Sequence, residues 1–357
     1  MINKKVLFIT TGTEITASSR TRGYNYRPFL EKDGFNVKII PYNTRLDCRD
    51  NVLERRKGLA GRIINKIHQF YKCLFYLSIA AGYDVIFIQR VLFPVLFLKL
   101  LKRFAKKIIF DFDDAIYLAD SCKRGIFNKK KFGRRFKYTL SFSDRVIVSN
   151  NALKNISYAI NKNTDVLPTP VDTQRLVPVS FKKDNGAKVV IGWIGSAGST
   201  KYIESLKDVF KVLTDSNVDL SVKLIGAQVR KEDWGKNIYF GQWILERELE
   251  TLQGMDIGVM PLSDDEWSLG KGGYKLLQYM AVGIPSVASP VGINKEIIED
   301  GLTGFLAQTQ EEWIEKLFIL IKDKELRERM GKNAREKAEK LYSYNANSPK
   351  LAVFLSS

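Results

Sequence analysis

Short apolar runs alternate with segments of helical periodicity along the whole chain. In the first half the runs occupy 6–10, 36–41, 84–89, 107–113 and 145–150. In the second half they occupy 189–195, 222–226, 238–241, 257–262, 285–290 and 304–307. Nearly continuous apolar strands separated by helices are typical of parallel sheets that helices cover on both faces. Two such series predict an α/β protein made of two doubly wound, Rossmann-like domains.

A segment rich in proline, glycine and polar residues, 167–186, separates the two series. A chain of 357 residues also favours two cores over one. We therefore expect an N-terminal domain over 1–175, onto which 342–357 packs back, and a C-terminal domain over 176–341. In such a pair a ligand is expected at the carboxyl ends of the strands, in the cleft between the domains.

One predicted helix in the first half carries an apolar stripe surrounded by lysine and arginine. The stripe consists of Leu59, Ile63, Ile67, Phe70, Leu74 and Leu77. This spacing predicts an amphipathic helix, and the basic residues around it suit a helix that lies at a membrane surface. The alternative is that the stripe covers the predicted sheet. The chain's single histidine, His68, lies in this helix and is expected to be structural.

The net charge of +18 is confined to the first half of the chain. Residues 1–177 contain 33 Lys+Arg and 14 Asp+Glu, whereas the remainder contains 24 and 25. Solubility alone would not predict so one-sided a distribution. The first half is therefore expected to face an anionic partner, either a membrane surface or a nucleic acid. No nucleic-acid recognition module is recognisable, which favours the membrane.

No targeting signal is recognised in the sequence, which predicts a protein on the cytoplasmic side of a membrane. No apolar stretch is long enough to span a bilayer, and the N-terminus runs into a strand without the features of a signal peptide. Cys48, Cys73 and Cys122 are odd in number and lack metal-like spacing, so we expect reduced thiols. The expected location is cytoplasmic, with peripheral association to the inner face of the plasma membrane.

The segment 255–292 carries the most informative chemistry, because it reads strand, loop, glycine turn, helix, strand. Lys271, Lys275 and Gln278 are spaced i, i+4 and i+7, which predicts one shared helical face. Lysines in a first helical turn oppose the helix dipole and repel each other. Their presence indicates a bound anion, and the alternative is a surface helix that happens to begin with lysines.

Glycines and a second turn support the anion. Backbone N–H groups can approach a phosphate closely at Gly270, Gly272 and Gly273. After the strand at 189–195 another glycine turn leads into a helix, where Ser196 and Ser199 can cap the helix or hold phosphate and Lys201 lies in the first turn. Two such turns predict one multiply charged anion, such as a diphosphate.

These residues resemble the family 4 retaining glycosyltransferases, which have the GT-B fold. The resemblance is strongest over 191–304, including MAVGIPSVASPVG at 280–292, and weaker at 17–37, 83–90 and 110–117. The pattern DDxW–GKxGxK–LQYMA is similar to a bacterial surface-polysaccharide branch of that family. The resemblance implies transfer of a sugar, with retention of configuration, from a nucleoside-diphosphate-sugar to a hydroxyl of a glycan or lipid-linked precursor.

The chain departs from the family at several positions. The family's Glu-x7-Glu pair is replaced by Gly270 and Gln278, and its Arg for the diphosphate is replaced by Ser196, while Lys201 keeps the Lys. The resemblance implies that Gln278 takes the donor ribose and that Lys271 or Lys275 replaces the missing Arg. The missing carboxylate is expected from one of Asp264, Asp265 and Glu266.

The first half offers three carboxylates at the end of a predicted strand, Asp111, Asp113 and Asp114. In the family that the chain resembles, a histidine near this place lies close to the donor sugar. Asp113 or Asp114 can take that catalytic role by stabilising positive charge at the anomeric carbon. The alternatives are helix capping and a metal-binding DxD. Because lysine-bearing turns already neutralise a diphosphate, we expect no metal cofactor.

The loop after the first strand supplies further candidates. Arg20 and Arg22 can bind an acceptor phosphate, and Gly12 allows close approach to the donor phosphate. The alternative for both arginines is a solvated helix turn. Rival functions are a nucleotide-sugar epimerase or hydrolase, a non-catalytic nucleotide-sugar binder, and a nucleic-acid binder.

Overall fold

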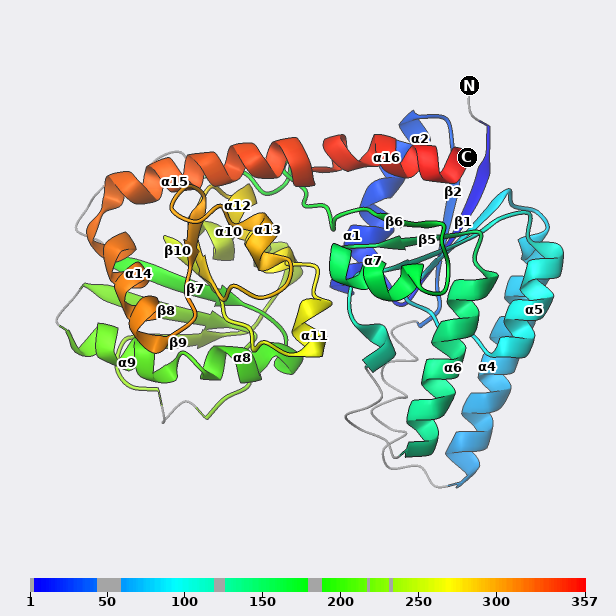
Figure 1. The fold of residues 1–357 in the computed structure, drawn as a ribbon, viewed down its shortest axis with the longest axis horizontal. Helices are drawn as coiled ribbons and strands as arrows, with labels where there is room; N and C mark the ends of the chain where they lie inside the picture. The colour runs from blue at the N-terminus through cyan, green and yellow to red at the C-terminus, as the bar shows by residue number, and fades with distance from the viewer. Residues whose placement is uncertain (1–2, 44–58, 119–125, 179–187, 217–218, 231–233) are drawn as a thin grey trace. The chain divides into compact units, whose positions relative to one another are not determined.

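The computed structural model describes residues 3–43, 59–118, 126–178, 188–216, 219–230 and 234–357, with the backbone alone for 59–66 and 126–132. The chain divides into two compact units (Figure 1). Unit 1 consists of Met1–Thr169 and Asn347–Ser357, and unit 2 is Pro170–Ala346. These divisions fall a few residues from the boundaries expected from the sequence.

Unit 1 contains a six-stranded sheet of order β2-β1-β3-β4-β5-β6 in which all neighbours are parallel. Its strands are β1 Lys5–Thr10, β2 Asn36–Pro41, β3 Val85–Gln89, β4 Ile108–Phe112, β5 Arg145–Val148 and β6 Thr164–Val166. Its helices are α1 Ala17–Arg22, α2 Arg27–Lys32, α4 Leu59–Ala80, α5 Val95–Phe104, α6 Ile126–Phe142, α7 Asn151–Tyr158 and the greater part of α16 Tyr344–Ser356.

Unit 2 contains a second parallel six-stranded sheet, of order β12-β11-β10-β7-β8-β9. Its strands are β7 Val189–Ile194, β8 Leu220–Ile225, β9 Ile238–Gly241, β10 Ile257–Met260, β11 Ser286–Ala288 and β12 Gly304–Leu306. Its helices are α8 Thr200–Glu204, α9 Lys207–Asp215, α10 Glu248–Gln253, α11 Glu266–Leu269, α12 Tyr274–Ala281, α13 Asn294–Ile297, α14 Gln310–Lys322 and α15 Lys324–Lys337.

The predicted fold class is confirmed, and every predicted apolar run forms a strand. The central strands are buried along almost their whole length, as the continuous runs required. The short strand β6 was not predicted. Its three residues, Thr-Asp-Val, carry too little apolar signal to be distinguished from a loop.

One strand glycine fixes how α12 packs on the unit 2 sheet. A Cβ at Gly258 of β10 would lie 2.4 Å from the ring of Tyr279, so only glycine allows that buried ring to lie against the strand. The Tyr279 hydroxyl accepts from the Ile194 N–H at 3.3 Å and donates to the Val259 carbonyl at 3.4 Å. These contacts hold α12 over β7 and β10.

The amphipathic helix α4 forms as predicted, but the side chains that it buries are mostly not those of the predicted stripe. Its buried side chains include Cys73, Tyr76 and Ala80. Of the predicted stripe, Ile67, Phe70 and Leu74 are exposed by 49%, 61% and 44%, whereas Leu77 packs against the core. The side chains of Leu59 and Ile63 lie outside the described part of the chain. Among the described residues no helix has the combined length and apolarity needed to cross a membrane. Cys48 and Cys122 lie outside the described residues.

Candidate functional site

The unit 2 sheet has its topological switch point between β7 and β10. The chain enters the sheet at β7, continues on one side to β8 and β9, and later crosses to β10 on the other side. Ligands of doubly wound sheets bind outside the carboxyl ends of the strands at such a point. The segments that follow β7 and β10 carry the lysines predicted to bind an anion.

Lys201 lies in the first turn of α8, as predicted. The preceding turn is held by Ser199 Oγ, which accepts from the Ser196 N–H at 3.2 Å and donates to the Ser196 carbonyl at 2.9 Å. The Lys201 ammonium lies 3.8 Å from Asp265 Oδ2 and 4.6 Å from the centre of the Tyr202 ring. Its side chain is 61% exposed, so the ammonium is accessible to a ligand.

Lys271 approaches the same ring from another loop. Helix α12 begins at Tyr274, so Lys271 lies in the turn before it, and the prediction that Lys271 shares a helical face with Lys275 is wrong. Its ammonium is nevertheless 5.5 Å from the centre of the Tyr202 ring. Lys275, on α12, lies over the Trp193 ring of β7 at 5.4 Å. Three ammonium groups are therefore gathered beside the end of β7.

The turn before α12 depends on glycine. Gly273 has φ +68°, a left-handed conformation that other residues rarely adopt, and a Cβ there would lie 2.2 Å from Ile297 Cδ1. Gly272 precedes it, and Gly270 caps the end of α11. The glycines thus set the position at which α12 begins, and with it the direction of its free N–H groups.

The carboxylates predicted near the donor sugar have different surroundings. Asp265 caps α11 by accepting from the Ser268 N–H at 2.7 Å, in addition to its ion pair with Lys201. Asp264 and Glu266 are exposed. Asp265 is therefore committed in part to local structure, and it also compensates the charge of one of the three lysines.

Gln278 belongs to a buried polar group that the sequence did not reveal. Its side chain is 4% exposed, and its Nε2 donates to Glu248 Oε1 at 3.0 Å. Glu248, at the start of α10, is almost fully buried and forms an ion pair with Arg175. A buried carboxylate needs such partners. The amide nitrogen of Gln278 is thus engaged within the protein, and no local pattern links three residues so far apart in sequence.

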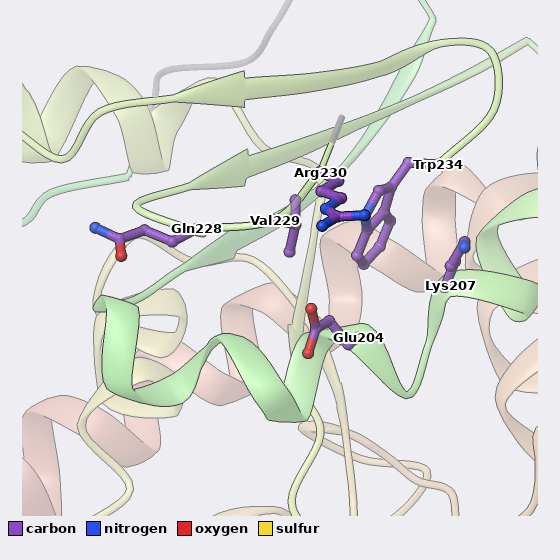
Figure 2. Close-up of a pocket in the computed structure, with 6 residues that line it drawn as sticks. All are labelled: Glu204, Lys207, Gln228, Val229, Arg230 and Trp234. Carbon is purple, nitrogen blue, oxygen red and sulfur yellow. The ribbon is translucent and has the colours of Figure 1, made fainter. Parts of the chain in front are cut away.

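Unit 2 also contains a pocket of about 610 Å³ (Figure 2). It is lined by Glu204, Lys207, Gln228, Val229, Arg230 and Trp234. None of the residues predicted from the sequence to bind the donor lines it. Its charged side chains come from α8, α9 and the loop after β8, on the side of β7 away from β10.

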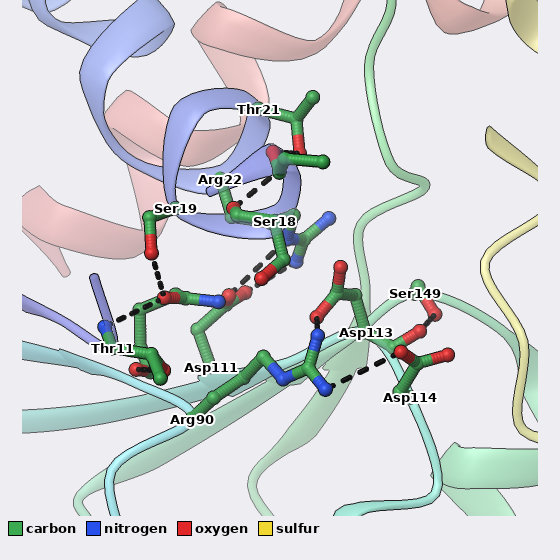
Figure 3. Close-up of polar contacts among 12 residues, drawn as sticks. Thr11, Ser18, Ser19, Thr21, Arg22, Arg90, Asp111, Asp113, Asp114 and Ser149 are labelled. Carbon is green, nitrogen blue, oxygen red and sulfur yellow. Dashed lines mark hydrogen bonds and ion pairs between the residues drawn. The ribbon is translucent and has the colours of Figure 1, made fainter. Parts of the chain in front are cut away.

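Of the predicted carboxylates of unit 1, Asp111 lies in β4 and Asp113 and Asp114 follow it, and arginines contact each of them (Figure 3). Asp111 is fully buried and pairs with Arg22, whose Nε donates to Asp111 Oδ2 at 3.1 Å. Asp113 and Asp114 each lie 3.3 Å from a guanidinium nitrogen of Arg90. Burial raises the pKa of Asp113 to about 6, against the opposing effect of Arg90. Among the described residues, the side chains of Asp113 and Asp114 accept no hydrogen bond that caps a helix.

The arginines proposed for the acceptor are both buried. Arg22 Nη1 donates to the carbonyls of Leu167 at 2.6 Å and Pro168 at 3.1 Å, so Arg22 ties α1 to the segment after β6. Arg20 Nη1 donates to the carbonyls of Glu14 and Ile15. This burial does not support the predicted acceptor role of Arg22, and it rules out the alternative of a solvated helix turn.

Gly12 has a structural reason of its own. A Cβ there would lie 2.3 Å from Thr16 Oγ1, and the Gly12 N–H donates to Ser19 Oγ at 3.0 Å. Ser19 in turn donates to Gln89 Oε1 at 3.2 Å, which links the ends of β1 and β3 (Figure 3). These two strands form the switch point of the unit 1 sheet.

Among the described residues no three histidine, cysteine or acidic side chains are grouped as a metal site. Independence from metal stays a prediction. Arg90 was missed from the sequence, although a charged residue directly after the predicted strand 84–89 was a usable signal. His68 is exposed on α4.

Part of unit 2 and several known proteins are similar in sequence. Residues 179–337 match the family model of glycosyl transferases group 1. Sulfoquinovosyl transferase SQD2 of Arabidopsis thaliana is 30% identical over 175 residues, which are 46% of this chain and 32% of that protein. An uncharacterized glycosyltransferase of Methanocaldococcus jannaschii, MJ1178, is 25% identical over 64% of this chain and 61% of its own length. The chain thus spans less than two thirds of these relatives.

Solved structures show the same fold over the whole chain. A glycosyltransferase from Rickettsia africae superposes with a TM-score of 0.71 at 14% identity, covering 100% of this chain and 98% of its own. Sucrose-phosphate synthase from Thermosynechococcus elongatus gives 0.70 at 14% identity, covering 99% and 100%. HepE of Anabaena, in complex with UDP and glucose, gives 0.66 at 15% identity, covering 99% and 100%. The fold is GT-B.

Proposed function

We propose, from the match of residues 179–337 to the model of glycosyl transferases group 1, that this protein transfers a sugar from a nucleoside-diphosphate-sugar to an acceptor hydroxyl. The observation that carries the proposal is the gathering of Lys201, Lys271 and Lys275 beside the end of β7. Three cations at a switch point suit a ligand with two phosphates. The bound UDP of the HepE structure makes a uridine diphosphate donor the first probe.

The bond between the anomeric carbon and the diphosphate oxygen breaks, and a bond from that carbon to the acceptor oxygen forms. The acceptor proton passes to the departing diphosphate, so no protein base is required, and we propose that configuration is retained. The lysines stabilise the charge that develops on the leaving group, which is the kind of contribution that often dominates catalysis. We propose that no metal is needed for this.

Asp113 and Asp114 remain the proposed catalytic carboxylates. Ionised oxygens near the reacting sugar stabilise the positive charge that develops at its anomeric carbon. Their contacts with Arg90 fix the orientation of both carboxylates.

Substitution of the lysines tests the donor site. We expect Lys201→Ala and Lys271→Ala each to lower kcat at least about tenfold, because each removes a charge that stabilises the leaving group. Lys207→Ala is the matched control, since Lys207 begins the next helix, α9, and lines the pocket of Figure 2 instead. Turnover of a UDP-sugar and calorimetric binding of UDP are measured for all three. Wild-type values in both lysine variants would refute the assignment.

A donor-only reaction is the alternative that needs separating. An epimerase or hydrolase on the same fold would consume the nucleotide-sugar without an acceptor, whereas a non-catalytic binder would bind UDP and leave the sugar intact. Product analysis with donor alone, and then with donor and lipid-linked acceptor, distinguishes the three. Transfer requires that the glycosylated acceptor is found only in the second reaction.

The exposed apolar side chains of unit 1 support a proposal about location. Helices α4 and α5 present a surface, here called the apolar face, of Ile67, Phe70, Tyr71, Leu74, Phe75, Leu96, Leu100 and Phe104, exposed by 39–71%. Exposed Lys99, Arg103 and Lys106 lie among them. Apolar bulk with neighbouring cations fits an anionic membrane surface. We propose peripheral binding to the inner face of the plasma membrane, where a lipid-linked precursor of a surface glycan is available.

Vesicle sedimentation tests the apolar face. We expect binding to vesicles with anionic lipid to be lost in Phe70→Glu, because a carboxylate would then face the anionic surface. Phe318→Glu is the matched control, since Phe318 is a similarly exposed residue of unit 2. Equal sedimentation of the two variants would refute the membrane proposal. Salt-dependent binding to DNA in place of vesicles would instead support a nucleic-acid partner.

A further inference from the structure

Arg90 has a backbone conformation that is rare for its residue type. Its φ is +60°, and among the described residues only one other non-glycine residue, Asn237, has positive φ. Asparagine tolerates this left-handed region, whereas arginine seldom adopts it. The conformation follows the end of β3, where the Arg90 N–H donates to the Asp111 carbonyl at 2.8 Å. Backbone strain of this kind concentrates at functional sites.

The turn directs the Arg90 guanidinium at two consecutive carboxylates (Figure 3). Nη1 lies 3.3 Å from Asp113 Oδ1, and Nη2 lies 3.3 Å from Asp114 Oδ2. The side chains of Arg90 and Asp113 are only 21% and 11% exposed, so water screens this contact weakly. Among the described residues Asp113 Oδ1 has no hydrogen-bond partner besides this ion pair.

The charges around Asp113 show why Arg90 is needed. The groups that act on it are Arg90, Asp114, Arg22 and Asp111. Arg22 is committed to Asp111 through Nε and Nη2, and its Nη1 to two carbonyls. Arg90 is therefore the cation that compensates Asp113 and Asp114 together. Burial raises the pKa of Asp113 to about 6 even with Arg90 in place. Loss of this cation would raise that pKa further, because the charged carboxylate would lose its compensating charge.

We propose that Arg90 is a positioning residue that fixes the Asp113 carboxylate and keeps it ionised for its work on the sugar. This inference rests on the proposed glycosyl transfer for its purpose, though not for its electrostatics. A neutral Asp113 could not stabilise positive charge at an anomeric carbon. The strained turn at Arg90 is then explained, because it brings a guanidinium to carboxylates that follow the neighbouring strand.

The test compares Arg90→Gln and Arg90→Gly with Arg90→Lys. The glycine variant removes the charge and relieves the left-handed backbone, so it serves where the glutamine variant fails to fold. Arg145→Gln is the matched control, since Arg145 pairs with Asp165 at the opposite end of the strands. The readouts are the pH profile of kcat, carboxyl-carbon NMR titration of Asp113 assigned with Asp113→Asn, and UDP affinity by calorimetry.

We expect the acid limb of the kcat pH profile to move to higher pH. In Arg90→Gln and Arg90→Gly both the kcat profile and the Asp113 titration should move upward by at least about one pH unit, a tenfold change in proton affinity. Arg90→Lys should remain near wild type, and UDP affinity should not change. An Asp113 titration that does not move overturns the inference, as does a loss of kcat equal at every pH. Failure of the wild-type protein to bind UDP would refute the proposed function instead, and the titration would still decide the role of Arg90.

Discussion

Removal of the Arg22 guanidinium should destabilise unit 1 strongly. Arg22→Ala leaves Asp111 fully buried without its cation, and it also leaves the carbonyls of Leu167 and Pro168 without their donor. Breaking a buried ion pair by removing one partner costs about 3–5 kcal/mol. Each unsatisfied carbonyl adds a further penalty of about 1 kcal/mol or more, though such costs are not additive. We expect a loss of at least about 4 kcal/mol.

The assay is urea unfolding followed by far-ultraviolet circular dichroism, with hydrogen exchange to locate the effect. Circular dichroism is needed because all five tryptophans of the chain lie in unit 2, so their fluorescence does not report on unit 1. Peptides containing β4 and β6 should lose protection. Arg27→Ala is the matched control, because the Arg27–Glu31 pair is exposed by 54% and 43% and such pairs contribute about 0–1 kcal/mol.

Two results would refute this reasoning. One is a loss in Arg22→Ala no larger than that in Arg27→Ala. The other is an Arg22→Leu, Asp111→Leu double variant as unstable as Arg22→Ala, because replacing both charges by apolar groups should recover much of the loss. Normal stability with lost acceptor turnover in Arg22→Ala would restore the acceptor role expected from the sequence.

Three further predictions concern the two sites. Gly273→Ala should lower stability by about 2–4 kcal/mol in thermal unfolding, since it adds left-handed strain to the clash with Ile297; unchanged unfolding would refute it. Gln278→Glu should lower stability at pH 8 more than at pH 5, because it sets a second carboxylate against Glu248; a pH-independent effect would contradict this. Asp113→Asn should stabilise the protein by up to about 3 kcal/mol at pH 8 and not at pH 3. The pKa of Asp113 is raised in the folded protein, so the folded wild type loses stability as pH rises from about 4 to about 6. A substitution that changes stability equally at the two pH values would exclude this prediction.

The sequence predicted the fold well because the signals for it are local. Continuous apolar runs identify buried parallel strands wherever they occur, and only the three residues of β6 escaped. The helix α4 was equally clear from its periodicity. Which of its faces is buried was not, because Cys73, Tyr76 and Ala80 form a second, weaker stripe that only the packing reveals.

The site was predicted in part, and the limit is again locality. The lysines after β7 and β10 were found because two glycine turns mark them. The start of α12 was placed too early, since three nearby glycines are equivalent in sequence and only Gly273 is left-handed. Arg22 and Gln278 were assigned to ligands, whereas partners 89 and 30 residues away hold them. A buried polar side chain cannot be distinguished from an exposed one without its distant partner.

Unit 1 is built from two separated pieces of chain, and this affects how the protein is made. Lys107 donates to the Phe354 carbonyl at 2.7 Å, and the Arg145 guanidinium lies 4.9 Å from the Phe354 ring, so 347–357 completes unit 1. Translation delivers all of unit 2 before that segment emerges. Since domains generally fold as they are synthesised, unit 2 can reach its final contacts while the earlier strands of unit 1 still wait for α16. Unit 1, most of which is translated first, can therefore complete its folding only after unit 2 has been translated.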